Sequence, residues 1–172
     1  MNGTIEYYNS NADKFSRETL HVDMSAFYEP LLELIPRSGK ILDAGCGSGR
    51  DSLYFMQHGY QVEAFDGSAE MCRLASKLIA QPVEQKTFDE VDWDSEFDGV
   101  WACASLLHVR RDSMDAVLER LCQALRPSGV IFASFKHRDE EWEQQGRFFN
   151  GYSEDSFRQL IEGHPSLRVK SI

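Results

Sequence analysis

The sequence lacks the segments that tie a chain to a membrane or to export. Its 172 residues include no apolar run of roughly 18 residues, the length that a membrane-spanning helix needs. The first ten residues, MNGTIEYYNS, have neither a basic start nor an apolar core, so we expect no signal peptide. The four cysteines at 46, 72, 103 and 122 follow no C-x-x-C or zinc-site spacing. We therefore expect reduced thiols, a cytoplasmic location and no metal site.

Positive charge is also scarce. The chain has 28 acidic and 18 basic residues, which gives a net charge of -10. The nearest approach to a basic stripe is the pair Arg110-Arg111, so long RNA or DNA is not an expected partner. A hydrophobic content of 42% with 27% charged residues is ordinary for a globular protein. Without internal repeats, the length predicts a single domain over residues 1–172 that acts on a small molecule.

The most informative segment is the run ILDAGCGSGR at residues 41–50. A short apolar strand over 40–44 leads into a loop with glycine at 45, 47 and 49, and a helix over 51–57 follows. Such glycines let a ligand lie against the backbone, and the N–H groups that open the helix then face it. The dinucleotide pattern G-x-G-x-x-G fails, because its sixth position holds Arg50 or Ser52. Asp43, before the first glycine, suits a ligand with a positive end and no pyrophosphate, such as S-adenosylmethionine (SAM).

An acidic residue completes this pattern. The segment 61–65 alternates apolar and polar residues like a strand and ends at Asp66, which lies 21 residues after Gly45. An acid about 20 residues beyond a glycine loop is placed to bind the two hydroxyls of a ribose. The alternative is that Asp66 is a turn residue before Gly67. Strand, glycine loop, helix, strand and acid together favour the ribose interpretation.

With these motifs, the chain resembles the class I SAM-dependent methyltransferases. Within them it is similar to a bacterial branch near the tellurite-resistance-type and small-molecule methyltransferases. The resemblance is carried by residues 7–12, 41–54, 97–109, 127–136 and 146–149. It implies an α/β fold: a Rossmann-like, mostly parallel sheet with helices on both faces.

The resemblance also implies a function and a cofactor site. The expected reaction moves a methyl group from SAM to a small acceptor and leaves S-adenosylhomocysteine (SAH). A soft nucleophile, as in tellurite- or thiol-type enzymes, is one alternative, and a SAM-binding module without activity is another. The cofactor residues expected from the motifs are Asp43, Gly45, Cys46, Gly47, Gly49, Asp66, Gly67, Ser68, Met71, Phe88, Asp89, Ala104 and Ser105.

Residues for the acceptor side are less well defined by the sequence. His108 follows the turn that in the family faces the transferring methyl group, so it is a candidate general base; the alternative is a packed histidine. Tyr7, Tyr8, Arg147 and Tyr152 are candidates for contact with the substrate, and the tyrosines of the first helix have a core role as their alternative.

The pattern of elements predicts alternating strands and helices after two initial helices. The predicted helices are 5–18, 25–34, 51–57, 69–79, 113–125 and 154–161, and the predicted strands are 40–44, 61–65, 83–87, 97–103, 130–135 and 167–172. Residues 137–152 show no clear periodicity. The family has a seventh, antiparallel strand for which no segment remains, so we expect a C-terminally truncated domain. The alternatives are that strand 167–172 takes another place or that another chain fills the gap. Strand 130–135 would then be an apolar edge that promotes self-association.

Overall fold

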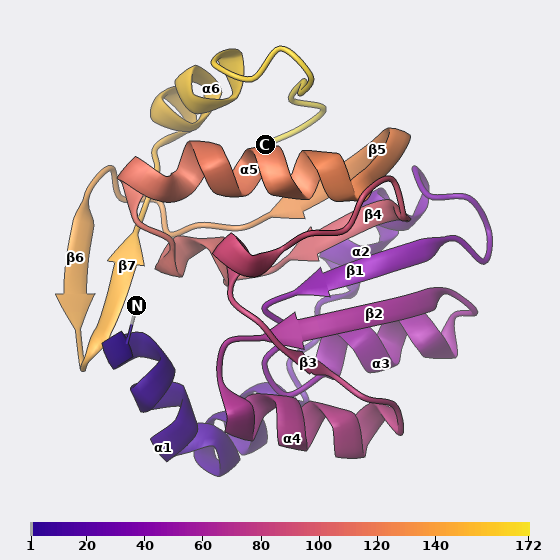
Figure 1. Cartoon of the computed structure of the whole chain (residues 1–172), viewed down its shortest axis with the longest axis vertical. Coiled ribbons are helices and arrows are strands. Elements are labelled where there is room, and N and C mark those ends of the chain that lie inside the picture. Colours follow the sequence, from indigo (N-terminus) through magenta and orange to yellow (C-terminus); the bar gives the residue numbers. More distant parts are fainter. Residues whose placement is uncertain (1) are drawn as a thin grey trace.

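The computed structural model describes residues 2–172 and consists of a central parallel sheet between helices (Figure 1). The sheet has five strands in the order β3-β2-β1-β4-β5. Their bounds are β1 Lys40–Ala44, β2 Gln61–Asp66, β3 Glu84–Gln85, β4 Phe97–Ala102 and β5 Leu125–Ala133. The helices are α1 Asn2–Thr19, α2 Ser25–Leu32, α3 Arg50–Gln57, α4 Ala69–Ile79, α5 Met114–Ala124 and α6 Glu154–Glu162. The predicted α/β fold with a parallel sheet is confirmed.

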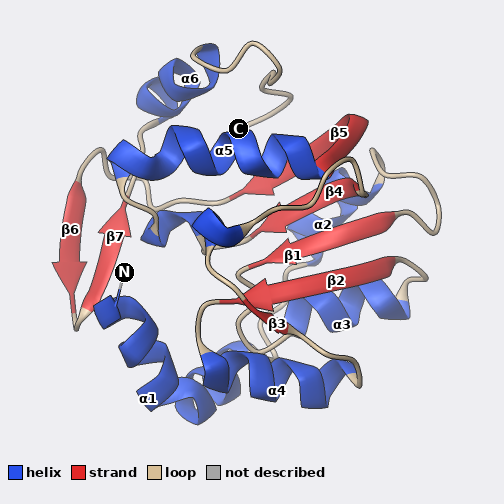
Figure 2. Cartoon of the chain, in the orientation of Figure 1, coloured by secondary structure: helices blue, strands red, loops and turns tan. Residues whose placement is uncertain are grey.

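The two faces of the sheet are covered by different helices. Side chains alternate along a strand, so neighbouring residues of β1 point to opposite faces. Leu42 belongs to one buried cluster together with Met114 and Leu121 of α5. Ile41 belongs to a second cluster with Leu31 of α2 and Phe55 of α3. Figure 2 shows α5 on one side of the strands and α2 and α3 on the other. Burial on both faces explains why β1 is apolar without alternation.

All strand pairs of the central sheet are parallel, so their carboxyl ends share one edge. Asp43 of β1 lies opposite Ala64 of β2 and Trp101 of β4 in the register. In Figure 1 this edge faces α1 and a separate two-stranded hairpin. Loops at the carboxyl ends of parallel strands are where α/β proteins bind ligands.

The hairpin lies in the segment for which the sequence predicted no element. It comprises β6 (Glu141–Gln144) and β7 (Arg147–Asn150), paired antiparallel. Gln145 and Gly146 connect them with φ of 53° and 77°, as a tight two-residue hairpin turn requires. Trp142 stacks on its cross-strand partner Phe149 at 5.1 Å between ring centroids. The hairpin therefore has its own apolar pair and is not part of the central sheet.

Several predicted boundaries were wrong. Residues 167–172 form no strand, and Ile172 is 58% exposed, because no neighbouring strand offers them backbone partners. β5 begins at Leu125, five residues before the predicted start at 130, and pairs only with β4 in the described chain. β3 is reduced to Glu84–Gln85, whereas α1 already begins at Asn2. Within residues 2–172, no helix is both long and apolar enough to cross a membrane.

Candidate functional site

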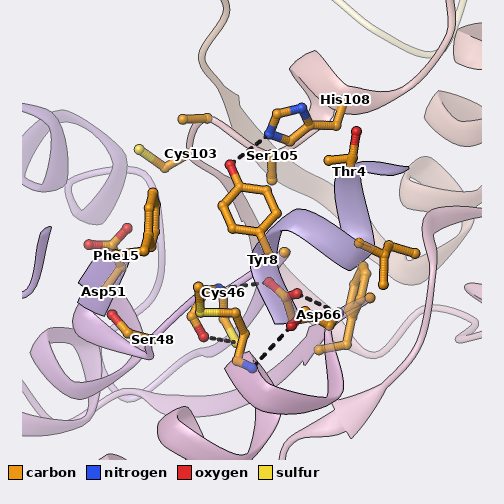
Figure 3. A pocket seen from close by; sticks show the side chains of 18 of the residues that line it. Thr4, Tyr8, Phe15, Cys46, Ser48, Asp51, Asp66, Cys103, Ser105 and His108 are labelled. Carbon is orange, nitrogen blue, oxygen red and sulfur yellow. Dashed lines mark hydrogen bonds between the residues drawn. The ribbon is translucent and has the colours of Figure 1, made fainter. Parts of the chain in front are cut away.

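A cavity of about 390 Å³ opens at the carboxyl edge of the sheet, beneath α1 (Figure 3). The predicted site residues that line it are Tyr8, Gly45, Cys46, Gly47, Asp66, Gly67, Ser68, Met71, Phe88, Ala104, Ser105 and His108. Of the remaining predicted residues, Tyr7, Asp43, Gly49, Asp89, Arg147 and Tyr152 do not line it. The structure thus gathers most of the predicted site into one concave surface.

The glycine loop forms the floor of the cavity, and its backbone geometry requires glycine. Gly45 has φ of +77°, and a Cβ there would lie 2.5 Å from the Cβ of Ser105. Ser105 in turn donates from its hydroxyl to the carbonyl of Ala44 at 2.6 Å. The turn after β4 therefore packs directly on the loop after β1, which is possible only because Gly45 has no side chain.

Asp66 ties the glycine loop to the end of β2. Its Oδ2 accepts from the N–H of Gly47 at 2.9 Å, and its Oδ1 accepts from the N–H of Ser68 at 2.8 Å. Burial raises the pKa of this carboxyl, and the two backbone donors oppose that rise. Each carboxylate oxygen retains a lone pair beyond these bonds. Asp66 therefore fixes both loops and can still accept from a ligand in the cavity.

Asp43 lies near the end of β1, before the glycine loop, and its side chain is directed behind the loop. It is 2% exposed and its Oδ2 accepts from the hydroxyl of Ser52 at 2.6 Å. Burial, with nearby Asp51 as the next cause, raises the pKa of Asp43. Gly49 is likewise behind the cavity, where a Cβ would lie 3.0 Å from that of Ala75. Both residues shape the loop from below, and neither lines the cavity.

One end of the cavity holds a buried charged cluster that the sequence did not reveal. Arg50 donates from Nε to Asp51 Oδ1 at 2.5 Å and from Nη2 to Oδ2 at 2.9 Å. Asp51 also accepts from the Tyr28 hydroxyl at 2.5 Å and from Trp101 Nε1 at 2.7 Å. Arg50 Nη1 donates to the carbonyl of Thr19 at 3.3 Å. The cluster therefore joins α3 to α2, to β4 and to the end of α1.

Helix α1 lies across the cavity, and its side chains at 4, 8, 15 and 19 line it at helical spacing. Asn9 Oδ1 accepts from the Ser68 hydroxyl at 2.7 Å and from the N–H of Glu70 at 3.2 Å. At the other side, the hydroxyl of Thr4 accepts from the N–H of Phe148 at 2.9 Å. These bonds hold α1 between the start of α4 and the hairpin.

His108 lies at the cavity wall, in the short 3₁₀ helix Leu106–His108, and makes two hydrogen bonds. Its Nε2 is 3.0 Å from the Tyr8 hydroxyl, and its Nδ1 is 2.6 Å from the carbonyl oxygen of Phe148. Burial lowers the pKa of His108 to about 4, so the ring is neutral at pH 7. Figure 3 shows Tyr8 pointing across the cavity toward this ring.

Three of the predicted substrate residues lie outside the cavity wall. Tyr152 is buried against Phe135 and its hydroxyl accepts from Asn150 at 3.2 Å. The guanidinium of Arg147 packs on the ring of Tyr7 at 4.4 Å. Asp89 is exposed, whereas its neighbour Phe88 lines the cavity and contacts Phe65 edge-on at 5.3 Å. Of the two residues left open by the sequence, Phe88 is thus the one at the cavity.

Further lining residues were not predicted from the sequence. They are Thr4, Ile5, Phe15, Thr19, Met24, Ser48, Arg50, Asp51, Phe65, Lys86, Thr87, Cys103, Val109 and Ser134. Spacing along α1 carried a usable signal for positions 4, 8, 15 and 19, which share one helix face. Within residues 2–172, no cluster of three or more His, Cys, Asp or Glu side chains could hold a metal ion.

Solved structures of other proteins share this fold. A solved 1,6-didemethyltoxoflavin-N1-methyltransferase of Burkholderia thailandensis, with bound SAH, is 26% identical with a TM-score of 0.71 and covers 92% of this chain and 72% of its own. A TehB-like SAM-dependent methyltransferase of Corynebacterium glutamicum shares the fold at 21% identity and a TM-score of 0.65, over 92% of this chain and 81% of its own.

Curated relatives match a shorter region. A putative methyltransferase, YqeM, of Bacillus subtilis is 28% identical over 113 residues, which is 59% of this chain and 46% of that protein. A malonyl-[acyl-carrier protein] O-methyltransferase of Pectobacterium atrosepticum is 40% identical over 112 residues, 60% of this chain and 42% of that protein. The chain spans somewhat less than half the length of these two relatives. The family model for a methyltransferase domain matches residues 41–129, slightly more than half of the chain, which therefore belongs to the methyltransferase domain family.

Proposed function

We propose that this chain binds SAM in the cavity beneath α1 and transfers its methyl group to a small acceptor. The observation that carries the proposal is Asp66, a partly buried carboxylate with free lone pairs that is bonded to the glycine loop and faces the cavity. SAM supplies an electrophilic methyl group on a sulfonium, so the protein has only to bind it, position the acceptor and manage a proton.

The lining residues fit the parts of this cofactor. Asp66 can accept from both ribose hydroxyls, and Phe65, Met71 and Phe88 provide an apolar wall for an adenine ring. At the opposite end, Arg50 uses three of its N–H groups for Asp51 and Thr19, which leaves two for a carboxylate. A cavity of about 390 Å³ is also within the usual range for small ligands.

A small acceptor is supported by the shape of the site. The cavity lies under α1, which is held by Asn9 at one side and by Thr4 at the other. A net charge of -10 is unfavourable for a polyanionic substrate. The 1,6-didemethyltoxoflavin-N1-methyltransferase of Burkholderia thailandensis, solved with 1,6-didemethyltoxoflavin bound, has the same fold over most of this chain. A single methyltransferase domain over residues 1–172 and a cytoplasmic location, which the four free cysteines fit, belong to the same proposal.

Calorimetry with SAM, SAH and NADH tests the cofactor. SAM and SAH should bind and NADH should not, because the loop breaks the dinucleotide spacing at Arg50. Release of labelled methyl groups to a panel of small metabolites then tests transfer. Binding without any transfer would favour the alternative of a SAM-binding module, and absence of SAM binding would refute the proposal.

A further inference from the structure

Three segments far apart in the sequence meet at His108. Tyr8 comes from α1, His108 from the turn after β4, and the carbonyl of Phe148 from β7. The distances are 3.0 Å from Tyr8 Oη to His108 Nε2 and 2.6 Å from Nδ1 to the Phe148 oxygen. Tyr8 and His108 both line the cavity (Figure 3). A donor, a base and a group that orients the base are the parts of a general-base arrangement.

The partners determine the direction of each hydrogen bond. A carbonyl oxygen only accepts, so the Nδ1 of His108 carries the hydrogen. A neutral imidazole has one N–H, so Nε2 must accept and the Tyr8 hydroxyl must donate to it. Both nitrogens of His108 are then in use, and His108 has no free lone pair for a ligand. The remaining lone pairs of Tyr8 Oη can only accept a hydrogen bond.

Burial keeps this pair neutral at rest, and charged neighbours have smaller effects. Arg147 of β7 lies 6.0 Å from the centroid of the Tyr8 ring. Its charge lowers the pKa of His108 further, after the larger effect of burial. Burial raises the pKa of Tyr8, while Arg147 lowers it and Asp66 and Tyr7 raise it. At pH 7, Tyr8 is therefore a neutral phenol and His108 a neutral imidazole, so neither residue of the pair is charged before the acceptor binds.

The geometry points to a proton relay in which Tyr8, and not His108, contacts the acceptor. In this relay the atom of the acceptor that is methylated carries a hydrogen, as in a hydroxyl or an N–H group. This inference rests on the proposed methyl transfer. Because Tyr8 Oη can only accept, it forms a hydrogen bond with an acceptor that has an X–H group. A carboxylate or a fully substituted amine offers only lone pairs, so it forms no hydrogen bond with Tyr8 Oη. The site therefore selects neutral protic acceptors.

The transfer step balances in atoms and charge. The acceptor's lone pair forms the bond to the methyl carbon, and the pair of the broken carbon–sulfur bond stays on sulfur. The acceptor's proton moves to Tyr8 Oη while the Tyr8 proton moves to His108 Nε2. The sulfonium charge disappears as the imidazolium charge appears, so the net charge of the site is unchanged. The imidazolium then releases its proton to water. The low pKa of His108 favours this release.

Labelled SAM and pairs of matched acceptors test the relay. Suitable pairs are phenol with benzoate and aniline with N,N-dimethylaniline. The wild-type protein should methylate the protic member of a pair at a rate that changes little from pH 5 to 9. Tyr8→Phe should lower that rate roughly 10²- to 10⁴-fold. Its residual rate on phenol should rise with pH, because only the ionised acceptor then reacts. A merely structural Tyr8 would not produce this change of pH profile.

Controls separate the relay from the cofactor site. Tyr60→Phe makes the same chemical change at a partly buried residue packed beneath the sheet and should behave like the wild type. The double variant Tyr8→Phe/His108→Gln should be no slower than Tyr8→Phe alone, since the two residues act as a unit. SAH affinity, measured by calorimetry, should be nearly equal in all variants. Failure of the wild type to bind SAM or SAH would refute the proposed function itself.

Three results would overturn the relay while SAM binding stands. They are methylation of benzoate as fast as phenol, an unchanged rate in Tyr8→Phe, and no transfer to any protic acceptor. NMR of ring-labelled histidine provides a readout without catalysis. His108 should carry its hydrogen on Nδ1, and finding it on Nε2 would also contradict the relay.

Discussion

Replacing Asp51 with asparagine should lower the free energy of unfolding by about 3–5 kcal/mol, the usual effect of removing one partner from a buried ion pair. The carboxylate of Asp51 is buried and accepts four hydrogen bonds, two from Arg50, one from Tyr28 and one from Trp101. Asparagine has nearly the same shape, so the change removes charge and accepting capacity without opening a cavity.

The magnitude follows from the partners that remain. The asparagine oxygen can accept from two of the four donors, but its NH₂ group must then face either Trp101 Nε1 or Arg50, which are donors only. Hydrogen bonds to a charged group contribute about 1.5–3 kcal/mol each. Arg50 would keep one hydrogen bond to the asparagine oxygen and one to the carbonyl of Thr19 at 3.3 Å, and it would lose its charged partner. Against a typical total stability of about 5–15 kcal/mol, the variant should be marginally folded.

Urea unfolding at pH 7, followed by tryptophan fluorescence and circular dichroism, measures the loss. Asp92→Asn is the matched control, because the Asp92 side chain is 76% exposed in its pair with Lys86, and its unfolding midpoint should stay close to that of the wild type. A loss of less than about 1 kcal/mol in Asp51→Asn would refute the reasoning. If that variant does not fold, Tyr28→Phe, which removes a single donor, should cost about 1.5–3 kcal/mol.

Three further predictions concern the cofactor, pH and the sheet edge. Asp66→Ala should weaken SAH binding on the order of 100-fold by calorimetry, given about 1.5–3 kcal/mol per lost charged hydrogen bond, with the fold retained; unchanged affinity would remove Asp66 from the site. The pKa of His108 is about 4 when folded and about 6.5 when unfolded, so the unfolded state binds more protons and stability falls as pH drops from 6.5 to 4. His108→Gln should remove about 3 kcal/mol of that fall in urea titrations at each pH, and identical pH profiles would contradict the shift. The edge strand β5 should promote dimers at high concentration in light scattering, and a monomer throughout would show that the edge is protected.

The part of the fold that the sequence predicted well depends on local patterns. β1 runs from Lys40 to Ala44, as predicted, because a short apolar run before a glycine loop leaves few alternatives. Asp66 and the glycine loop meet because β1 and β2 are parallel neighbours, so both loops leave the sheet at the same edge. The spacing from Gly45 to Asp66 therefore encodes a contact as well as a motif.

The parts that the sequence did not predict depend on partners far along the chain. Residues 167–172 alternate like a strand, but a strand needs a neighbour and none is present for them in the described chain. Pro127 and Gly129 are residue types that favour turns, yet they lie within β5, where the register against β4 shifts between Phe97 and Gly99. There the turn residues produce an irregularity in the ladder instead of ending the strand.

The charged cluster around Asp51 at one end of the cavity also depends on partners far along the chain. In the sequence, Asp51 is an acidic side chain in the first turn of α3, where negative charge is favourable. Its hydrogen-bond partners Tyr28 and Trp101 are 23 and 50 residues away, so no local pattern could reveal the cluster. The carboxylate of Asp51 becomes a buried hydrogen-bond acceptor only because α2 and β4 pack against α3.

The site is therefore completed from both ends of the chain. The carboxyl edge of the sheet supplies the glycine loop, Asp66 and the turn that carries His108. Helix α1 and the hairpin, which have no strand in the central sheet, supply Tyr8 and the carbonyl that orients His108. Thr4 joins these two segments through the N–H of Phe148. Because Phe148 bonds to both Thr4 and His108, a displacement of β7 would move the base and α1 together. The hairpin, for which the sequence predicted no element, thus positions His108 directly and α1 through Thr4.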